Sequence, residues 1–185
     1  MKLILCVALV WINACCILHA EEITAEYKQG VYHLNASFIV EASAEKVVAA
    51  LTDYENISQL HPTIIESEIL ETTSSKITAR IRTVVKDCAI FFCKKITRVE
   101  NITQRGFASL DAEVVPFLSD LRSGHTSWKF VSVDNHTEVT YLATMQPKFW
   151  IPPLIRSHTV TNKFKKRISE IVQRLQVLAP SYPLK

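Results

Sequence analysis

The chain has 185 residues, with 21 lysine and arginine against 18 aspartate and glutamate side chains and a formal net charge of +3. This near-neutral balance, with no cationic run interleaved with aromatic residues, argues against a nucleic-acid-binding protein. The chain holds only three glycines and no repeat or low-complexity stretch, so nothing in it indicates a second domain or a linker.

Residues 1–20 are expected to be a secretory signal peptide. Lys2 precedes a mostly apolar run from Leu3 to Leu18, and Ala20 stands before an acidic pair. A positive start, an apolar centre and a small residue at the cleavage point are typical of such peptides. An uncleaved anchor is an alternative, although the run is shorter than the ~20 apolar residues of a membrane span. A lipoprotein signal is another, because residues 12–15 resemble a bacterial lipobox.

Cleavage after Ala20 predicts an exported protein, periplasmic or secreted, that consists of residues 21–185. This length suits one domain with its own core. Three of the five cysteines precede the cleavage point, so Cys88 and Cys93 remain. Because exported proteins meet an oxidising environment, this pair predicts a disulfide, with two free thiols as the alternative.

Residues 31–40 are predicted to form the first strand, half-buried, because polar and apolar side chains alternate along them. Its inward side chains would be Tyr32, Leu34, Ala36, Phe38 and Val40. A short helix is predicted to begin after the N-cap residue Ser43 and to run to Leu51. A second short helix or turn covers Ile57–His61 and ends at Pro62.

Strands without intervening helices are predicted for the middle of the chain, because apolar residues recur there at every second position. They cover residues 64–71, 77–86, 94–101, 108–114, 126–130 and 139–145. Residues 134–136, Asp-Asn-His, are typical of a hairpin turn between the last two. Short connections between successive strands favour one antiparallel sheet.

A long helix is predicted from Leu154 to Leu178. Pro152 and Pro153 suit its first turn, where a missing N–H costs nothing, and Pro180 ends it. Its apolar positions recur at steps of three and four, which gives one apolar stripe. At 1.5 Å per residue the helix would be roughly 37 Å long, enough to lie across a whole sheet.

The element order therefore predicts an α+β fold, in which one curved antiparallel sheet packs on a long C-terminal helix. A helix stripe cannot fill such a bent sheet by itself, so a cavity between the two is expected.

This order resembles the START-like superfamily that includes the Bet v 1 allergens and the polyketide cyclases, and is closest to its coenzyme-Q-binding and polyketide-cyclase-like branch. The segments that carry the resemblance are Phe38–Val47, Leu51–Asn56, His61–Pro62, Ser119–Asp120 with Trp128, and Met145–Ile155. The last two are similar to exported bacterial members. The resemblance implies a helix-grip fold, with two short helices after the first strand, but it is weak for function because this fold hosts carriers, cyclases, hydrolases and partner-binding proteins.

A hydrophobic ligand, a lipid or an isoprenoid quinone, is the expected occupant of the cavity. The residues expected to line it are Phe38, Tyr54, Trp128, Phe130, Tyr141, Met145, Phe164 and Ile168. A filled core is the alternative for any one of them, although tyrosine and tryptophan also carry a polar group that could orient a ligand.

Two other functions remain open. A cyclase-type or hydrolase-type enzyme would use His61, Asp120 and Arg122, although no catalytic pattern gathers them. An adaptor would bind a protein through its exposed face and have a filled core. No cofactor, metal or catalytic residue is assigned, and the protein is expected to be a monomer.

The segment between the two cysteines is predicted to be a hairpin tip. An extended chain would separate their Cα atoms by roughly 16 Å, whereas a disulfide needs about 4.4–6.8 Å. The chain must therefore reverse direction between them. The apolar tip, Ile90, Phe91 and Phe92, would then either contact an anionic membrane transiently or fold back over the cavity as a lid.

Overall fold

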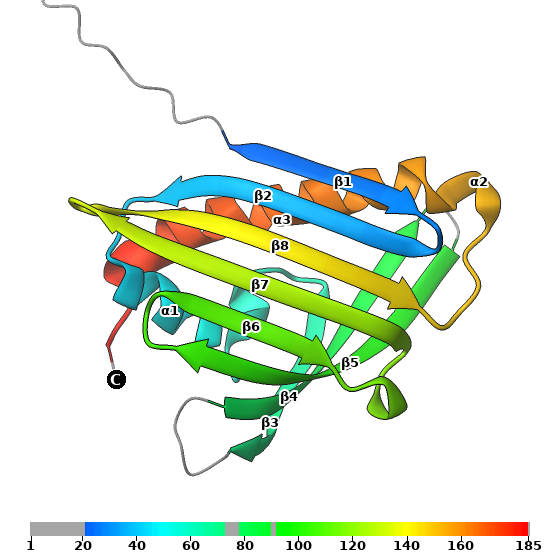
Figure 1. Ribbon diagram of the computed structural model, residues 1–185, viewed down its shortest axis with the longest axis horizontal. Coiled ribbons are helices and arrows are strands. Elements are labelled where there is room, and N and C mark those ends of the chain that lie inside the picture. Colours follow the sequence, from blue (N-terminus) through cyan, green and yellow to red (C-terminus); the bar gives the residue numbers. More distant parts are fainter. Residues whose placement is uncertain (1–20, 73–77, 90–91, 185) are drawn as a thin grey trace, which may run out of the picture.

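The computed structural model describes residues 21–72, 78–89 and 92–184 (Figure 1). The expected signal peptide, residues 1–20, lies outside the described residues, as do Ile90 and Phe91 of the expected hairpin tip. The strands are β1 (Glu22–Lys28), β2 (Val31–Val40), β3 (Ile64–Thr72), β4 (Thr78–Ala89), β5 (Phe92–Arg105), β6 (Ser109–Val114), β7 (Leu121–Val133) and β8 (His136–Pro147). The helices are α1 (Ala44–Thr52), α2 (Pro153–Arg156) and α3 (His158–Leu178), and the short 3₁₀ turns are η1 (Ile57–Gln59), η2 (Pro116–Leu118) and η3 (Ala179–Ser181).

The strands form one eight-stranded sheet in the order β1-β2-β8-β7-β6-β5-β4-β3. Every pairing in it is antiparallel. The sheet curves, and α3 lies along it from end to end (Figure 1). The α+β fold expected from the element order, a curved antiparallel sheet around a long C-terminal helix, is therefore confirmed.

Strand β1 was not predicted from the sequence. Its exposed positions carry charged and polar residues, which alternate strictly with the half-buried Ile23, Ala25 and Tyr27, so the period-two signal was present in the sequence and was overlooked. It pairs with β2 through a tight hairpin at Gln29 and Gly30, whose φ angles of +50° and +87° suit the right-handed twist of the two strands. Because of β1, the well-buried strand β2 is not an edge of the sheet.

The long helix is interrupted at Ser157, where one continuous helix from Leu154 was expected. The short helix α2 precedes the break, and α3 follows it. The Tyr32 hydroxyl donates a hydrogen bond of 2.9 Å to the Arg156 carbonyl oxygen at this break. A side chain of β2 therefore satisfies a carbonyl at the end of α2, and this contact ties the break to the sheet.

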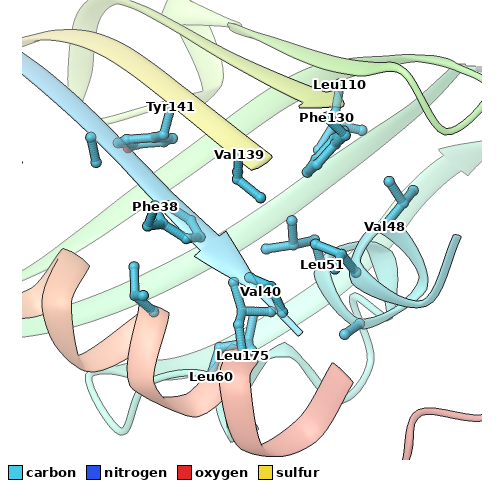
Figure 2. Close-up of a cluster of buried hydrophobic side chains, with 14 of the residues drawn as sticks. Phe38, Val40, Val48, Leu51, Leu60, Leu110, Phe130, Val139, Tyr141 and Leu175 are labelled. Carbon is cyan, nitrogen blue, oxygen red and sulfur yellow. The ribbon is translucent and has the colours of Figure 1, made fainter. Parts of the chain in front are cut away.

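One end of the interface between sheet and helix is closely packed. Figure 2 shows Phe38 and Val40 of β2, Val139 of β8 and Leu175 of α3 converging beside α1. These side chains are buried and belong to one hydrophobic cluster. Val48 and Leu51 of α1 cover this end.

Candidate functional site

A cavity of about 260 Å³ lies between the sheet and α3. Its wall is mostly apolar, and strands from β2 to β8 contribute to it together with α3 and the segment after α1. The aromatic residues in the wall include Tyr32, Tyr54, Trp128, Tyr141, Phe149 and Phe164. The core between sheet and helix is therefore not completely filled by side chains.

Six of the eight residues expected at the cavity line it. They are Tyr54, Trp128, Tyr141, Met145, Phe164 and Ile168. Phe38 and Phe130 do not line it; both belong to the packed core (Figure 2). Phe130 lies behind Trp128, with the two rings stacked at a centroid distance of 6.4 Å. Phe38 pairs across the sheet with Val139 near the end that α1 covers. The rings of Phe38 and Phe130 therefore do not reach the cavity.

The Tyr54 hydroxyl is the most distinctive polar group in the wall. Its oxygen is buried and has no hydrogen-bond partner among the described residues. Burial, together with the nearby Glu100 carboxylate, raises the pKa of Tyr54 well above its ordinary value of 10.0. The phenol therefore stays protonated, and its O–H is a buried donor with no acceptor among the described residues.

Tyr141 contributes a second neutral phenol to the wall. Burial raises the pKa of Tyr141 to about 12, and the charges of Arg98, Glu100 and Arg167 also act on it. Its ring lies against Trp128, with a centroid distance of 4.3 Å. The two side chains present one aromatic surface on neighbouring strands β7 and β8.

A partly buried ion pair also lies in the wall, and the sequence reasoning missed it. The Arg98 Nε atom lies 2.8 Å from an oxygen of the buried Glu100 carboxylate. Both residues stand on β5 between Ile96 and Ile102, which line the same cavity. Opposite charges at two successive positions of the strand face, between Ile96 and Ile102, were the available signal, since an unpaired charge is rarely buried there.

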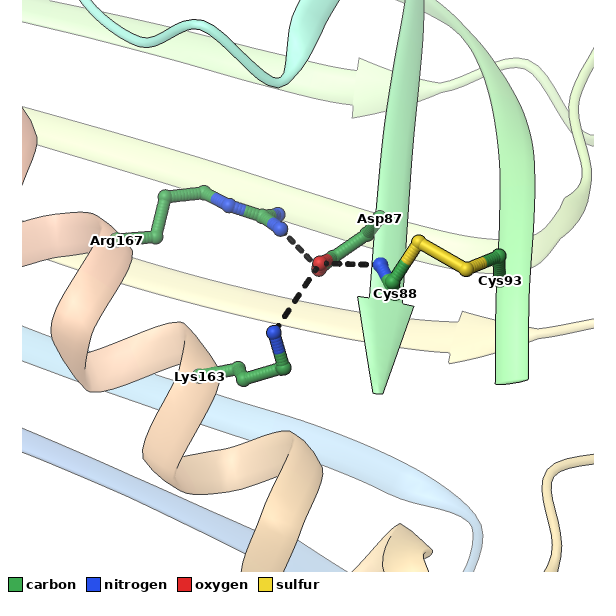
Figure 3. The surroundings of a disulfide bond; sticks show 5 residues. All are labelled: Asp87, Cys88, Cys93, Lys163 and Arg167. Carbon is green, nitrogen blue, oxygen red and sulfur yellow. Dashed lines mark hydrogen bonds and ion pairs between the residues drawn. A yellow bond between two sulfur atoms is a disulfide. The ribbon is translucent and has the colours of Figure 1, made fainter. Parts of the chain in front are cut away.

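A second ionic cluster joins the β4–β5 hairpin to α3 (Figure 3). The Asp87 carboxylate pairs with the Arg167 guanidinium, lies 3.9 Å from the Lys163 ammonium, and accepts a 2.8 Å hydrogen bond from the Cys88 N–H. All three charged residues line the cavity. The cluster therefore fixes the hairpin against the helix at one side of the cavity.

The disulfide and the chain reversal around it are confirmed. Cys88 and Cys93 pair across β4 and β5, with Cα atoms 3.9 Å apart, and their sulfur atoms are bonded (Figure 3). Ile90 and Phe91 lie outside the described residues, and the side chain of Phe92 is not described. The expectation that this tip contacts a membrane or closes the cavity therefore stays a prediction.

The residues considered for catalysis do not line the cavity. His61 is 5% exposed, and its ring nitrogens lie 2.7 Å from Thr63 Oγ1 and 2.7 Å from Glu170 Oε2. Asp120 accepts a 2.8 Å hydrogen bond from the Thr97 N–H. Its carboxylate thus supplies the acceptor that a neighbouring strand would otherwise provide to β5. Arg122 is exposed on β7.

Three further observations concern metal binding, membrane crossing and His125 in the described residues. Their His, Cys, Asp and Glu side chains form no group of three or more that could hold a metal ion. Their helices include none that is both long enough and apolar enough to cross a membrane. His125 lies outside the cavity lining, with its Nδ1 atom 3.0 Å from a Glu113 carboxylate oxygen.

Comparisons with known proteins point to one family. The family model described as polyketide cyclase / dehydrase and lipid transport matches residues 40–166. A search of curated proteins finds no match to this sequence.

Solved structures share the fold at low sequence identity. A START superfamily protein from Mycobacterium smegmatis is 15% identical, with a TM-score of 0.61 over 78% of this chain and 94% of that one. A STAR-related lipid transfer protein from Xanthomonas axonopodis is 18% identical, with a TM-score of 0.59 over 84% and 98%. The Zhui aromatase/cyclase from Streptomyces sp. R1128 is 14% identical, with a TM-score of 0.53 over 80% and 87%. At these identities the likeness shows the fold alone.

Proposed function

Because the chain belongs to the polyketide cyclase / dehydrase and lipid transport family, we propose that it binds a hydrophobic small molecule in the cavity between the sheet and α3. In this proposal the protein carries its ligand rather than converting it. The observation that carries the proposal is the combination of a mostly apolar cavity with one buried, unpartnered hydroxyl, that of Tyr54.

The Tyr54 hydroxyl suggests what the ligand must offer. A buried donor without an acceptor costs roughly 1–3 kcal/mol, and an acceptor on a bound ligand would recover that cost. The ligand is therefore a mostly apolar molecule with an oxygen that accepts a hydrogen bond from Tyr54. A lipid with a carbonyl or carboxyl oxygen, or the carbonyl of an isoprenoid quinone head group, meets both requirements.

The size of the cavity further restricts the class of ligand. Pockets for drug-sized ligands are typically about 300–1,000 Å³, and this cavity, at about 260 Å³, lies just below that range. It suits one acyl or prenyl chain, or one ring system, better than a lipid with two full chains. Trp128 and Tyr141 would contact such a ligand with their ring faces.

Fluorescence titration tests the proposal, because Trp128 lies in the cavity wall. A quinone analogue or a fatty acid should change the tryptophan emission saturably. Trp150 also emits, and Trp11 does so in a preparation that retains residues 1–20, so the titration is repeated with these tryptophans replaced by Phe. Native mass spectrometry and solvent extraction of the purified protein then identify any lipid that copurifies.

The variant Tyr54→Phe sharpens the test. We expect ligand affinity to fall about fivefold, the value of one hydrogen bond of about 1 kcal/mol. The denaturation midpoint of the ligand-free protein should not fall, and should rise if the buried, unpartnered hydroxyl carries its full cost. Tyr27→Phe, which changes a tyrosine outside the cavity lining, is the matched control and should bind as the unmodified protein does. Absence of a saturable signal from a broad apolar panel would contradict the proposal and favour an adaptor function.

A further inference from the structure

The end of the molecule that carries η2 and α2 exposes large apolar side chains. Phe117 on η2 is 98% exposed, Leu154 on α2 is 87% exposed, and Trp150 just before α2 is 70% exposed. Leu118, beside Phe117, is also exposed. We call these four residues the apolar rim. Folding leaves isolated apolar residues on most surfaces, but side chains this large and this exposed, gathered at one end, mark an interaction site.

The two parts of the apolar rim are held at the same end of the fold. Lys148 connects them, because its backbone N–H donates a 2.9 Å hydrogen bond to the Asp120 carbonyl oxygen. Its ammonium group also donates a 2.6 Å hydrogen bond to the Pro116 carbonyl oxygen. Figure 1 shows α2 and the turn between β6 and β7 at one end of the sheet, opposite the end where α1 lies. The rim therefore has a fixed arrangement rather than belonging to a loose loop.

The rim adjoins the cavity. Phe149 and Ile151 line the cavity, whereas Trp150 between them is exposed. The Lys94 ammonium lies 4.6 Å from the centre of the Phe149 ring, and Lys94 also lines the cavity. The same short segment thus has one face on the cavity and the other on the exposed rim.

Basic residues accompany the rim in the sequence, and two of the acids at this end have partners. The basic residues in the segments that form this end are Lys94, Lys95, Arg122, Lys148 and Arg156. Asp120 accepts a hydrogen bond from the Thr97 N–H, and Asp87 pairs with Arg167 and Lys163. Apolar side chains with lysine and arginine in the same segments are complementary to a bilayer that carries anionic lipids, since the apolar side chains enter the interface while the cations meet the head groups.

We propose that the apolar rim docks on an anionic phospholipid bilayer. Phe117, Trp150 and Leu154 would enter the head-group region, where tryptophan is favoured. Docking would place Phe149 and Ile151, and with them the adjoining end of the cavity, against the membrane. The proposal goes beyond ligand binding, because the cavity could take up its ligand from solution whether or not the rim binds lipid.

Sedimentation with vesicles tests the docking. The probes are vesicles of phosphatidylcholine containing about 30 mol% phosphatidylglycerol and vesicles of phosphatidylcholine alone. The protein is used as it is recovered from expression, with its N-terminus determined by mass spectrometry, so that every variant shares the same N-terminal segment. Binding to the anionic vesicles should exceed binding to the neutral ones and should weaken as salt rises from about 0.1 M to about 0.5 M.

The double variant Phe117→Ser with Trp150→Ser should lower the vesicle partition coefficient by roughly tenfold or more, because two large side chains no longer leave water on docking. The matched control is Val131→Ser with Leu142→Ser, which changes two exposed apolar residues on β7 and β8 outside the rim and should leave partitioning unchanged. Circular dichroism and the denaturation midpoint verify that both variants fold. Insertion of Trp150 into the bilayer is also measured directly, by quenching of its emission with brominated lipid in a protein with Trp11 and Trp128 replaced by Phe. This measurement does not depend on the double variant.

Equal partitioning of the rim variant and the unmodified protein would overturn the proposal, as would an unquenched Trp150. A concentration-dependent dimer that the rim variant abolishes, without vesicle binding, would also overturn it, since the rim would then bind a second copy of the chain. Ligand titration of the rim variant separates the docking proposal from the ligand-binding proposal. Unchanged affinity for the soluble ligand shows that the cavity binds it independently of the rim.

Discussion

The two ends of the interface between the sheet and α3 are built differently. At the end beside α1, buried aliphatic and aromatic side chains such as Val40, Val139 and Leu175 meet directly (Figure 2). Beyond these side chains a cavity extends from Leu51 of α1 to Phe149 after β8. At the far end of this cavity Asp87, Lys163 and Arg167 join the β4–β5 hairpin to the helix (Figure 3). One end is held by packing, and the other by charges and a disulfide.

This difference indicates how the fold combines stability with a binding site. A packed end provides dispersion contacts and removes apolar surface from water, so it contributes most of the stability. The cavity end lacks those contacts, and its ionic and covalent ties keep the hairpin in place without filling the space between sheet and helix. The ion pairs and the disulfide should therefore affect the local order of the β4–β5 hairpin more than the free energy of global unfolding.

The largest expected effect comes from breaking the packed end. Leu175→Ala should lower the free energy of unfolding by about 2–5 kcal/mol, because Leu175 is 0% exposed and its loss would leave a new cavity. Phe164→Ala should cost about half as much, since Phe164 borders space that is already empty. Urea denaturation of both variants measures the difference.

Val177→Ala is the control for both changes, because Val177 lies on the same helix, is 73% exposed, and should have almost no effect on unfolding. A loss from Phe164→Ala as large as that from Leu175→Ala would show that the two ends are equally packed and would remove the distinction.

A smaller effect is expected from cutting the covalent tie at the cavity end. Replacing Cys88 and Cys93 by Ala should cost about 2 kcal/mol, because so short a loop restricts the unfolded chain only modestly. Hydrogen exchange should become faster at the ends of β4 and β5 and stay unchanged in α1 and β2. Thiol counting under denaturation without reductant is the control: two free thiols would contradict the disulfide itself.

The smallest effect concerns the contact between Glu170 on α3 and His61. The hydrogen bond from the His61 imidazole is the main reason why the pKa of Glu170 lies below its ordinary value of 4.5, and the Lys166 and Arg167 charges lower it further. A lowered carboxyl pKa in the folded protein gives stability that is present above pH 4.5 and is lost as the pH falls through the folded-state pKa.

Glu170→Gln should therefore lower stability at about pH 6 by roughly 0.5 kcal/mol, the size of an exposed ion pair. The difference from the unmodified protein should shrink as the pH falls below 4.5. Thermal denaturation at a series of pH values measures it. A difference that persists unchanged at low pH would show that the contact does not depend on the charge of Glu170.

Several features of the fold followed from local patterns. Alternating side chains placed most of the strands, and the apolar stripe placed the long helix. The distance that a disulfide can span was enough to predict the chain reversal between Cys88 and Cys93. The regular alternation of β1 was overlooked, although it is a local pattern. Local patterns could not find the break at Ser157, which depends on a hydrogen bond from Tyr32 on a distant strand.

The composition of the site was only partly predictable. The alternation showed that Phe38, Phe130 and Trp128 point toward the interior, but Trp128 alone of these three reaches the cavity. It could not show that Arg98 and Glu100 pair within the wall, because charged residues on a strand are usually assigned to the exposed face.

The sequence by itself determined the order of the elements and the face of each one that turns inward, since these depend on the periodicity of neighbouring residues. The tertiary structure alone decided what each inward face meets. Leu175 meets packed side chains whereas Phe164, on the same helix, meets empty space. The reason is that the neighbours of an inward face are set by contacts between residues far apart in the chain, such as those of α1 with β7 and β8.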